Sequence, residues 1–336
     1  MRPLQAALTL SSLVLLSCFL WARNPTRAGL LLVAVKGDNS VGIVDSRTSE
    51  KIAEVAEGGV TGHELTVSPD GRTAYVPIYG NAGVGEPGTD GHNMVVIDLA
   101  SRKVIGNVDF GKGVRPHCPV FGPKNGLLYV TTELNRSVSI IDPATLKIIG
   151  SIPTNQDQSH MLVISRDGHR GYTTNVGPGT VSVLDLDARK TIAVIPVSGQ
   201  IQRIALSVDG SKVFTSDQTK PQLAVIDTAT NKVTQWVPLP GLGYGSATTP
   251  DGKWLIIANP LIHKVSALNL STMKVEHVLD MPVRPQAILV RPDNQVAYVS
   301  CDKSRKVAVI NLSDWTVKDL IDVGPGADGM AWAKAE

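Results

Sequence analysis

Seven polar residues occupy matching places in a repeated pattern, each six positions ahead of a turn that recurs along the chain. In chain order they are His63, His117, His160, Gln202, Tyr244, Gln286 and, as the expected seventh, Asp328. All seven side chains can form hydrogen bonds, whereas a position needed only for packing would carry Val or Ala in some copies. The series therefore predicts one shared polar surface with three histidines side by side.

Neutral imidazoles accompanied by a carboxylate suit Zn, Cu or Fe, so His63, His117 and His160 are candidate ligands of a divalent metal, Zn or Cu. The same surface could instead hold an anionic substrate through arginine forks. A third interpretation is that the histidines bond to backbone groups and line a wet channel. The candidate ligand-binding residues are His63, Glu64, His92, Arg115, His117, Glu133, His160, Arg203, Tyr244 and Arg284.

The elements that must position these residues repeat with a period of about 42 residues. An apolar run ending in Asp or Asn recurs at Asp45, Asp98, Asp142, Asp185, Asp227, Asn269 and Asn311. In the last unit the expected strands are residues 287–290, 296–300, 306–310 and 317–322, rich in Val, Ile and Tyr and separated by Asp, Gly, Pro, Asn and Ser. Four strands per unit in seven units predict an all-β, seven-bladed propeller with antiparallel blades.

The two ends of the chain are expected to share one blade. Residues 30–35 align with the second strand of a unit, and the missing first strand is supplied by residues 328–333. Closing the ring in this way leaves no open sheet edge. Residues 29–336 are thus predicted to form a single propeller domain.

Residues 77–93 form a connection roughly ten residues longer than its counterparts, which is unusual in a compact domain. This connection is rich in glycine and also holds Glu86, Asp90 and His92. It belongs to the same unit as His63 and is expected on the same face of the disc, where it could fold over the channel mouth as a lid.

The repeats resemble the YVTN family of bacterial β-propellers from about residue 30 to the end. The resemblance lies in the segments Leu-Tyr-Val-Thr-Thr at 128–132 and Ala-Tyr-Val-Ser at 297–300, the turn Ser-Pro-Asp-Gly at 68–71, and the strand at 223–227 followed by Thr-Ala-Thr-Asn-Lys. It implies the fold, and such propellers serve many roles.

The chain is also similar, more distantly, to seven-bladed lactonases, which use His, Arg and Glu at the channel mouth. This resemblance makes Arg115, His117 and Glu133 candidate catalytic residues, with Arg115 holding a carboxylate and His117 or Glu133 carrying the proton. The order Arg-Pro-His at 115–117 differs from the Pro-Arg-His order usual in that family, and a second catalytic arginine is not evident.

Composition excludes several other functions. The 32 basic and 30 acidic residues leave a net charge of +2, and aromatic residues make up 4%, so no nucleic-acid partner is expected. Residues 4–22 carry no charge, which indicates a signal peptide or a membrane or lipid anchor within residues 1–28. Lipidation at Cys18, cleavage after Ala22 and an uncleaved span are all compatible with this segment.

Each of these outcomes places the body outside the cytoplasm, in a bacterial periplasm, with membrane contact only through the N-terminal segment. The sequence therefore predicts an exported, monomeric binding or scaffold protein that holds an unidentified protein or small molecule on its histidine-bearing face. The alternative is a lactonase-like hydrolase or metal-dependent enzyme that uses the same face.

Overall fold

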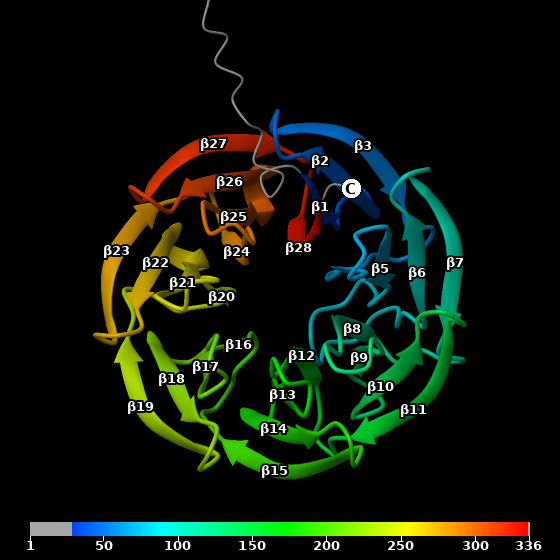
Figure 1. Cartoon of the computed structure of the whole chain (residues 1–336), viewed down its shortest axis with the longest axis horizontal. Helices are drawn as coiled ribbons and strands as arrows, with labels where there is room; N and C mark the ends of the chain where they lie inside the picture. The colour runs from blue at the N-terminus through cyan, green and yellow to red at the C-terminus, as the bar shows by residue number, and fades with distance from the viewer. Residues whose placement is uncertain (1–28, 335–336) are drawn as a thin grey trace, which may run out of the picture.

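The computed structural model describes residues 29–334, which form seven four-stranded antiparallel sheets arranged as blades around a central channel (Figure 1). The predicted fold class is confirmed. Residues 1–28, which carry the predicted signal peptide or anchor, lie outside the described residues. Within residues 29–334, the helices are too short to cross a membrane.

The blades follow one another in chain order, and strands within a blade run from the channel outward (Figure 1). Blade 1 comprises β28 (Ala327–Lys334), β1 (Gly29–Val35), β2 (Ser40–Asp45) and β3 (Glu50–Ala56). Blade 2 comprises β4 (Thr66–Val67), β5 (Thr73–Pro77), β6 (Asn93–Asp98) and β7 (Lys103–Asp109). Blade 3 comprises β8 (Pro116–Phe121), β9 (Leu128–Thr132), β10 (Ser137–Asp142) and β11 (Lys147–Pro153).

Blades 4 to 7 repeat this arrangement. They comprise β12 (Ser159–Ile164), β13 (Arg170–Asn175), β14 (Thr180–Asp185) and β15 (Lys190–Pro196); β16 (Ala205–Leu206), β17 (Lys212–Ser216), β18 (Gln222–Asp227) and β19 (Lys232–Pro238); β20 (Ser246–Thr248), β21 (Trp254–Asn259), β22 (Lys264–Asn269) and β23 (Lys274–Asp280); and β24 (Pro285–Val290), β25 (Val296–Cys301), β26 (Lys306–Asn311) and β27 (Thr316–Asp322). Two short 3-10 turns follow β21 and β25, at Pro260–Ile262 and Asp302–Ser304.

The four strands expected around Tyr298 match β24 to β27, and their ends differ by one or two residues. Most of the tight turns between the first and second strands contain an aspartate, and in blade 3 Asn125 takes its place. In blade 2, Asp70 accepts hydrogen bonds from Ser68 and from the backbone of Arg72, and Gly71 takes a positive φ of 84°. Asp and Gly suit such a turn because the side chain caps backbone donors and glycine tolerates positive φ.

The hydrophobic core lies between neighbouring blades. Leu32 and Ile43 of blade 1, for example, pack in one cluster with Val76 and Val95 of blade 2. The two middle strands of each blade are buried on both faces, whereas an outer strand such as β7 is mostly exposed. Each blade therefore needs both neighbours to bury its faces, so the stability of the ring depends on its closure.

The predicted closure is confirmed, because β28 pairs antiparallel with β1 and completes blade 1 (Figure 1). Leu32 lies opposite Ala331, and both are almost fully buried. Met330 of β28 also belongs to the cluster shared with blade 7. The last strand thus fills the inner edge of blade 1 and joins blade 1 to blade 7.

We predict that deleting residues 329–336 abolishes the cooperative unfolding transition. The deletion removes most of β28 and opens the ring between blades 1 and 7, which exposes the edge of β1 and part of the core. Circular dichroism during heating measures the transition. A substitution at exposed Leu320 in β27, Leu320→Ala, serves as control and should retain the wild-type transition. An unchanged melting curve for the deletion would show that closure is dispensable.

Candidate functional site

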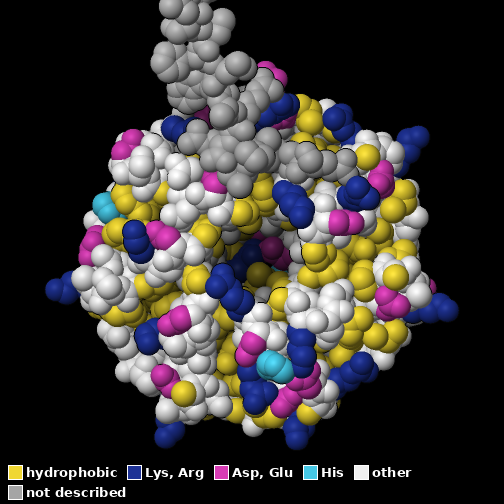
Figure 2. All heavy atoms as spheres, viewed as in Figure 1, with side chains coloured by type: hydrophobic (Ala, Val, Ile, Leu, Met, Phe, Trp, Pro, Cys, Tyr) yellow, Lys and Arg dark blue, Asp and Glu magenta, His cyan; other side chains and the backbone are white. Residues whose placement is uncertain are grey.

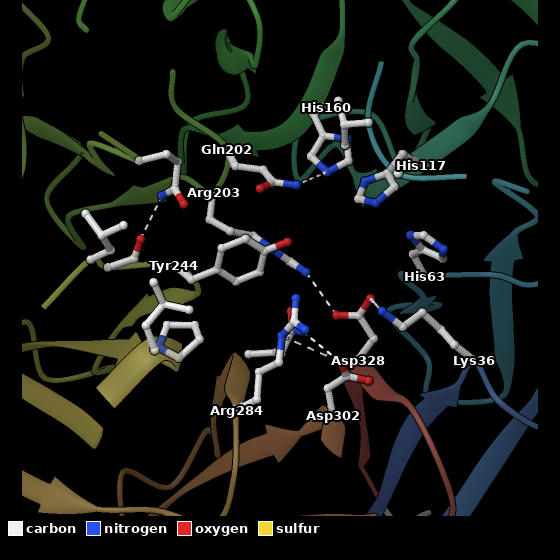
Figure 3. Close-up of a pocket in the computed structure, with 18 residues that line it drawn as sticks. Lys36, His63, His117, His160, Gln202, Arg203, Tyr244, Arg284, Asp302 and Asp328 are labelled. Atoms are coloured by element: carbon white, nitrogen blue, oxygen red, sulfur yellow. Dashed lines mark hydrogen bonds and ion pairs between the residues drawn. The ribbon is translucent and has the colours of Figure 1, made fainter. Parts of the chain in front are cut away.

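The channel widens on one face into a cavity of about 370 Å³. The seven polar residues of the repeat series all line it: His63, His117, His160, Gln202, Tyr244, Gln286 and Asp328 (Figure 3). They converge because each stands where the chain reaches the innermost strand of a blade, and those strands surround the channel. One residue from each of the seven blades thus contributes to one wall.

His117 contacts both of the other histidines. The rings of His117 and His160 stack with centroids 3.7 Å apart, and the ring of His63 meets His117 edge-on at 5.8 Å. Tyr79, from the long connection of blade 2, contacts all three rings, with centroid distances of 4.7 Å to His63, 5.1 Å to His117 and 6.1 Å to His160. Together these side chains form an aromatic cluster at one side of the cavity.

The histidines of this cluster are neutral at pH 7. Burial lowers the pKa of His63 to about 4. The pKa values of His117 and His160 lie well below the usual range because of burial and, secondarily, neighbouring His and Arg charges. The Nδ1 atoms of His117 and His160 have no hydrogen-bond partner within residues 29–334. The cluster therefore offers polar atoms without adding charge.

The geometry gives no support to the predicted metal site. Within residues 29–334, no group of three or more His, Cys, Asp or Glu side chains is arranged to hold a metal ion. The planes of His117 and His160 lie only 25° from parallel. Stacked rings present their nitrogens side by side, whereas a tetrahedral metal requires lone pairs that point to one centre.

Arg203 also lines the cavity and reaches across the channel. Its guanidinium donates to Glu64, at the inner edge of blade 2. It also donates to Asp328 in β28, at 3.1 Å, as Figure 3 shows. Lys36 pairs with the second oxygen of Asp328 at 2.9 Å, and the ring of Tyr244 lies 5.1 Å from the guanidinium. This network joins blade 5 to blades 1 and 2 on the opposite side of the ring (Figure 1).

Burial and pairing act against each other in this network. Burial, followed by the charge of Asp328, raises the pKa of Glu64 in spite of the Arg203 contact. Burial would also raise the pKa of Asp328, but the charges of Lys36 and Arg203 outweigh it, and that pKa is lowered. The carboxylates raise the pKa of Arg203 against the effect of burial, so the guanidinium stays charged.

Arg115 and Glu133 are placed outside the cavity, where they anchor the long connection between β5 and β6. The Nε of Arg115 donates to Asp90 at 2.6 Å, and Nη2 donates to the carbonyl of Glu86 at 2.6 Å. Glu133 pairs with Arg115 at 3.2 Å and accepts hydrogen bonds from the Tyr79 hydroxyl and the Gly85 amide. Both side chains are used in holding this segment in place.

The anchored connection, residues 78–92, forms part of the cavity wall through Gly83 and Val84. Its base is a narrow hairpin that requires glycine, since a Cβ at Gly91 would lie 1.6 Å from the carbonyl oxygen of Ile78. The connection therefore lies beside the channel mouth, on the same face as the histidines. Whether it moves as a lid stays a prediction.

The structure places some of the candidate residues away from the cavity. The trio of Arg115, His117 and Glu133 expected from lactonases is divided, because only His117 lines the cavity. His92 is exposed and lies 3.2 Å from Asp109 on the outer strand β7. Arg115 and Arg284 share a positive φ, but their side chains differ: Arg115 is 5% exposed within the anchor, whereas Arg284 is 50% exposed at the cavity. The remaining candidates, Glu64, Arg203 and Tyr244, belong to the network that crosses the channel.

A second repeat position would have found the residues that the sequence analysis did not single out. The position four residues after the one aligned with Tyr298 holds Lys36, Tyr79 and Asp302 in blades 1, 2 and 7. Lys36 and Asp302 line the cavity, and Tyr79 contacts the histidines. These polar residues could have been recognised by aligning the units, since they stand just after the second strand of each blade.

No protein-family model matches the chain, and no curated protein sequence matches it. The resemblance to the YVTN family is therefore not confirmed by a family match. The chain is similar to the solved structure of hydrazine synthase from Kuenenia stuttgartiensis, with a TM-score of 0.51 and 19% identity over 74% of this chain and 95% of that one. It is also similar to the dihydro-heme d1 dehydrogenase NirN in complex with DHE, with a TM-score of 0.66 and 16% identity over 91% of this chain and 75% of that one. At these identities both likenesses concern the fold alone.

We predict that Arg203→Met lowers the free energy of unfolding by about 3–5 kcal/mol, because it leaves Glu64 and Asp328 buried without their shared cation. Adding Glu64→Gln to this variant should recover part of the loss, since one uncompensated charge is then removed. Urea denaturation measures both effects. Lys264→Met, which breaks the exposed pair with Asp280, is the control and should cost no more than about 1 kcal/mol. If Arg203→Met and Lys264→Met lowered the free energy of unfolding equally, the cross-channel role of Arg203 would be contradicted.

We predict that Arg115→Met releases residues 78–92, since it removes the hydrogen bonds to Asp90 and the carbonyl of Glu86. Limited digestion with thermolysin, followed by mass spectrometry, should show cleavage within this segment several-fold faster than in the wild type. Arg136→Met is the matched control, because Arg136 pairs with Asp157 at an exposed position on the same face. Equal cleavage rates in the two variants would show that Arg115 does not anchor the segment.

Proposed function

We propose that this protein is a binding protein that holds a small molecule in the cavity at the channel mouth. The observation that carries the proposal is the convergence of one hydrogen-bonding residue from each of seven blades on one cavity. A volume of about 370 Å³ lies near the lower end of the range for ligand pockets, which runs from about 300 to 1,000 Å³. The ligand that suits it is a molecule the size of a common metabolite.

Unused polar atoms support binding at this place. The Nδ1 atoms of His117 and His160 and the Nε of Arg203 are buried and have no partner within the described residues. Such atoms are rare in folded proteins because an unmade hydrogen bond costs about 1–3 kcal/mol. Three of them beside one cavity are compatible with a site that becomes satisfied when water or a ligand fills it.

Binding is better supported than catalysis. A lactonase-like reaction needs an arginine and a proton carrier at the same substrate, and here Arg115 and Glu133 are engaged by the segment 78–92. An imidazole with a pKa of about 4, as in His63, is a weak base at pH 7. The export of the protein to the periplasm is part of the proposal and rests on residues 1–28 of the sequence.

We predict that at least one class of small molecule raises the melting temperature, and that Leu261→Trp lowers its affinity at least tenfold. Leu261 is 71% exposed at the rim, so a larger side chain narrows the mouth without disturbing the core. The measurement is a thermal-shift screen of amino acids, organic acids, amines and sugars, followed by calorimetry.

The matched control is Leu134→Trp, at a residue that is 47% exposed and lies outside the cavity. This variant should bind as the wild type does. The proposal fails if nothing in the screen binds, or if Leu261→Trp leaves the affinity of every bound compound unchanged.

A further inference from the structure

Charge is distributed unevenly around the cavity. Blades 2, 3 and 4 contribute neutral histidines, whereas blades 7 and 1 contribute two cations and two carboxylates (Figure 3). These are Arg284 and Asp302 from blade 7 and Lys36 and Asp328 from blade 1. Arg203 of blade 5 adds a third cation to the lining. A ligand that fills the cavity therefore meets the side chains of Arg284 and Asp302 on one side and uncharged imidazole rings on another.

The charges of blade 1 are already compensated. Asp328 accepts from Arg203 through one oxygen, at 3.1 Å, and pairs with Lys36 through the other, at 2.9 Å. Arg203 in turn pairs with Glu64. With Glu64 ionised, the charges of these two cations and two carboxylates cancel. The network therefore needs no ligand charge for compensation, although the Nε of Arg203 stays without a partner among the described residues.

The pair in blade 7 is different, because its members are only loosely joined. The closest approach between Arg284 Nε and Asp302 Oδ2 is 3.7 Å, which is too long for a hydrogen bond. The Asp302 side chain is 10% exposed and accepts a hydrogen bond from a neutral donor, Gln286, at 3.2 Å. The guanidinium of Arg284 is half exposed at the cavity.

Asp302 and Arg284 thus face each other as an ion pair without a hydrogen bond between them. Lys36, which also lies near Asp302, is paired with Asp328. A buried charge is costly unless it is paired at hydrogen-bonding distance. One small molecule that carries both an ammonium and a carboxylate would supply both missing partners. A simple anion would satisfy Arg284 alone, and a simple amine would satisfy Asp302 alone.

The opposite wall indicates what the rest of the ligand is. The rings of His63, His117 and His160 are neutral at pH 7 and carry no charge to pair with a charged group. Their flat faces and nitrogens suit aromatic or amide groups, which combine an apolar surface with hydrogen-bonding capacity. A charged side chain would lose its hydration there without gaining an ion pair.

We propose that the cavity binds an α-amino acid, or a similar small zwitterion, with an uncharged side chain. Arg284 binds the carboxylate as a bidentate fork, Asp302 binds the ammonium, and the side chain lies toward the histidines. This inference rests on the proposed function, since it names the ligand class of the same cavity. It adds a specific role for two residues that the repeat pattern alone does not distinguish.

The test compares three matched probes by calorimetry at pH 7. L-phenylalanine carries both charges, N-acetyl-L-phenylalanine carries only the carboxylate, and L-phenylalaninamide carries only the ammonium. We expect L-phenylalanine to bind at least tenfold more tightly than either analogue, because each analogue leaves one protein charge unpaired. L-lysine and L-glutamate should also bind at least tenfold more weakly than L-phenylalanine.

Two variants connect each charge to its residue. Arg284→Gln should weaken L-phenylalanine and bring its affinity to that of L-phenylalaninamide, since the carboxylate no longer has a partner. Asp302→Asn should weaken the binding of L-phenylalanine and bring its affinity to that of N-acetyl-L-phenylalanine, since the ammonium no longer has a partner. Arg136→Gln, on the same face but outside the cavity, should bind as the wild type does. The melting temperature of each variant without ligand shows whether it is folded.

The possible failures are distinguishable. If another class in the thermal-shift screen binds and is sensitive to Leu261→Trp, while the three phenylalanine probes do not bind, the proposed function stands and the zwitterion is overturned. Equal binding of all three probes, or binding of L-phenylalanine that is unchanged in Arg284→Gln and Asp302→Asn, also overturns it. If no compound binds the cavity, both proposals fail.

Discussion

Closure of the ring is the constraint on which the rest of this structure depends. Each blade buries its faces against two neighbours, so the strand β28 that completes blade 1 also completes the packing of blade 7. The same strand carries Asp328, which lines the cavity and binds Arg203 and Lys36. The strand that closes the fold therefore also helps to form the candidate site. A change that removes this strand disrupts both ring closure and the cavity.

The cross-channel network shows how a repeat fold can carry different side chains at the channel in different blades. A regular propeller would place similar side chains from every blade around its axis, but here a single arginine from blade 5 reaches carboxylates of blades 1 and 2. Burying these charges is costly, and mutual pairing compensates for the cost. The result is an ion-pair network across the channel, which lines one cavity together with the neutral histidines and the loosely paired charges of blade 7.

The segment between β5 and β6 is likewise fixed by contacts with another blade. Its length would permit many conformations, yet Arg115 and Glu133 of blade 3 hold it through hydrogen bonds to its backbone and side chains. Residues that resemble a catalytic pair in the sequence are thus used to fix a wall of the cavity. Residue type at a channel mouth does not by itself separate anchoring from chemistry, because arginine and glutamate suit both.

Seven blades, four strands in each, the closing strand and the series of seven polar residues at the channel could all be predicted from the sequence. They follow from periodicity, since a repeat that sets the spacing of strands also sets which residues share a face. The folded arrangement was needed to show that His117 lines the cavity while Arg115 and Glu133 do not, and that His92 is exposed beside Asp109. Side-chain direction depends on which partners lie within reach across blades, and no local pattern encodes those distances.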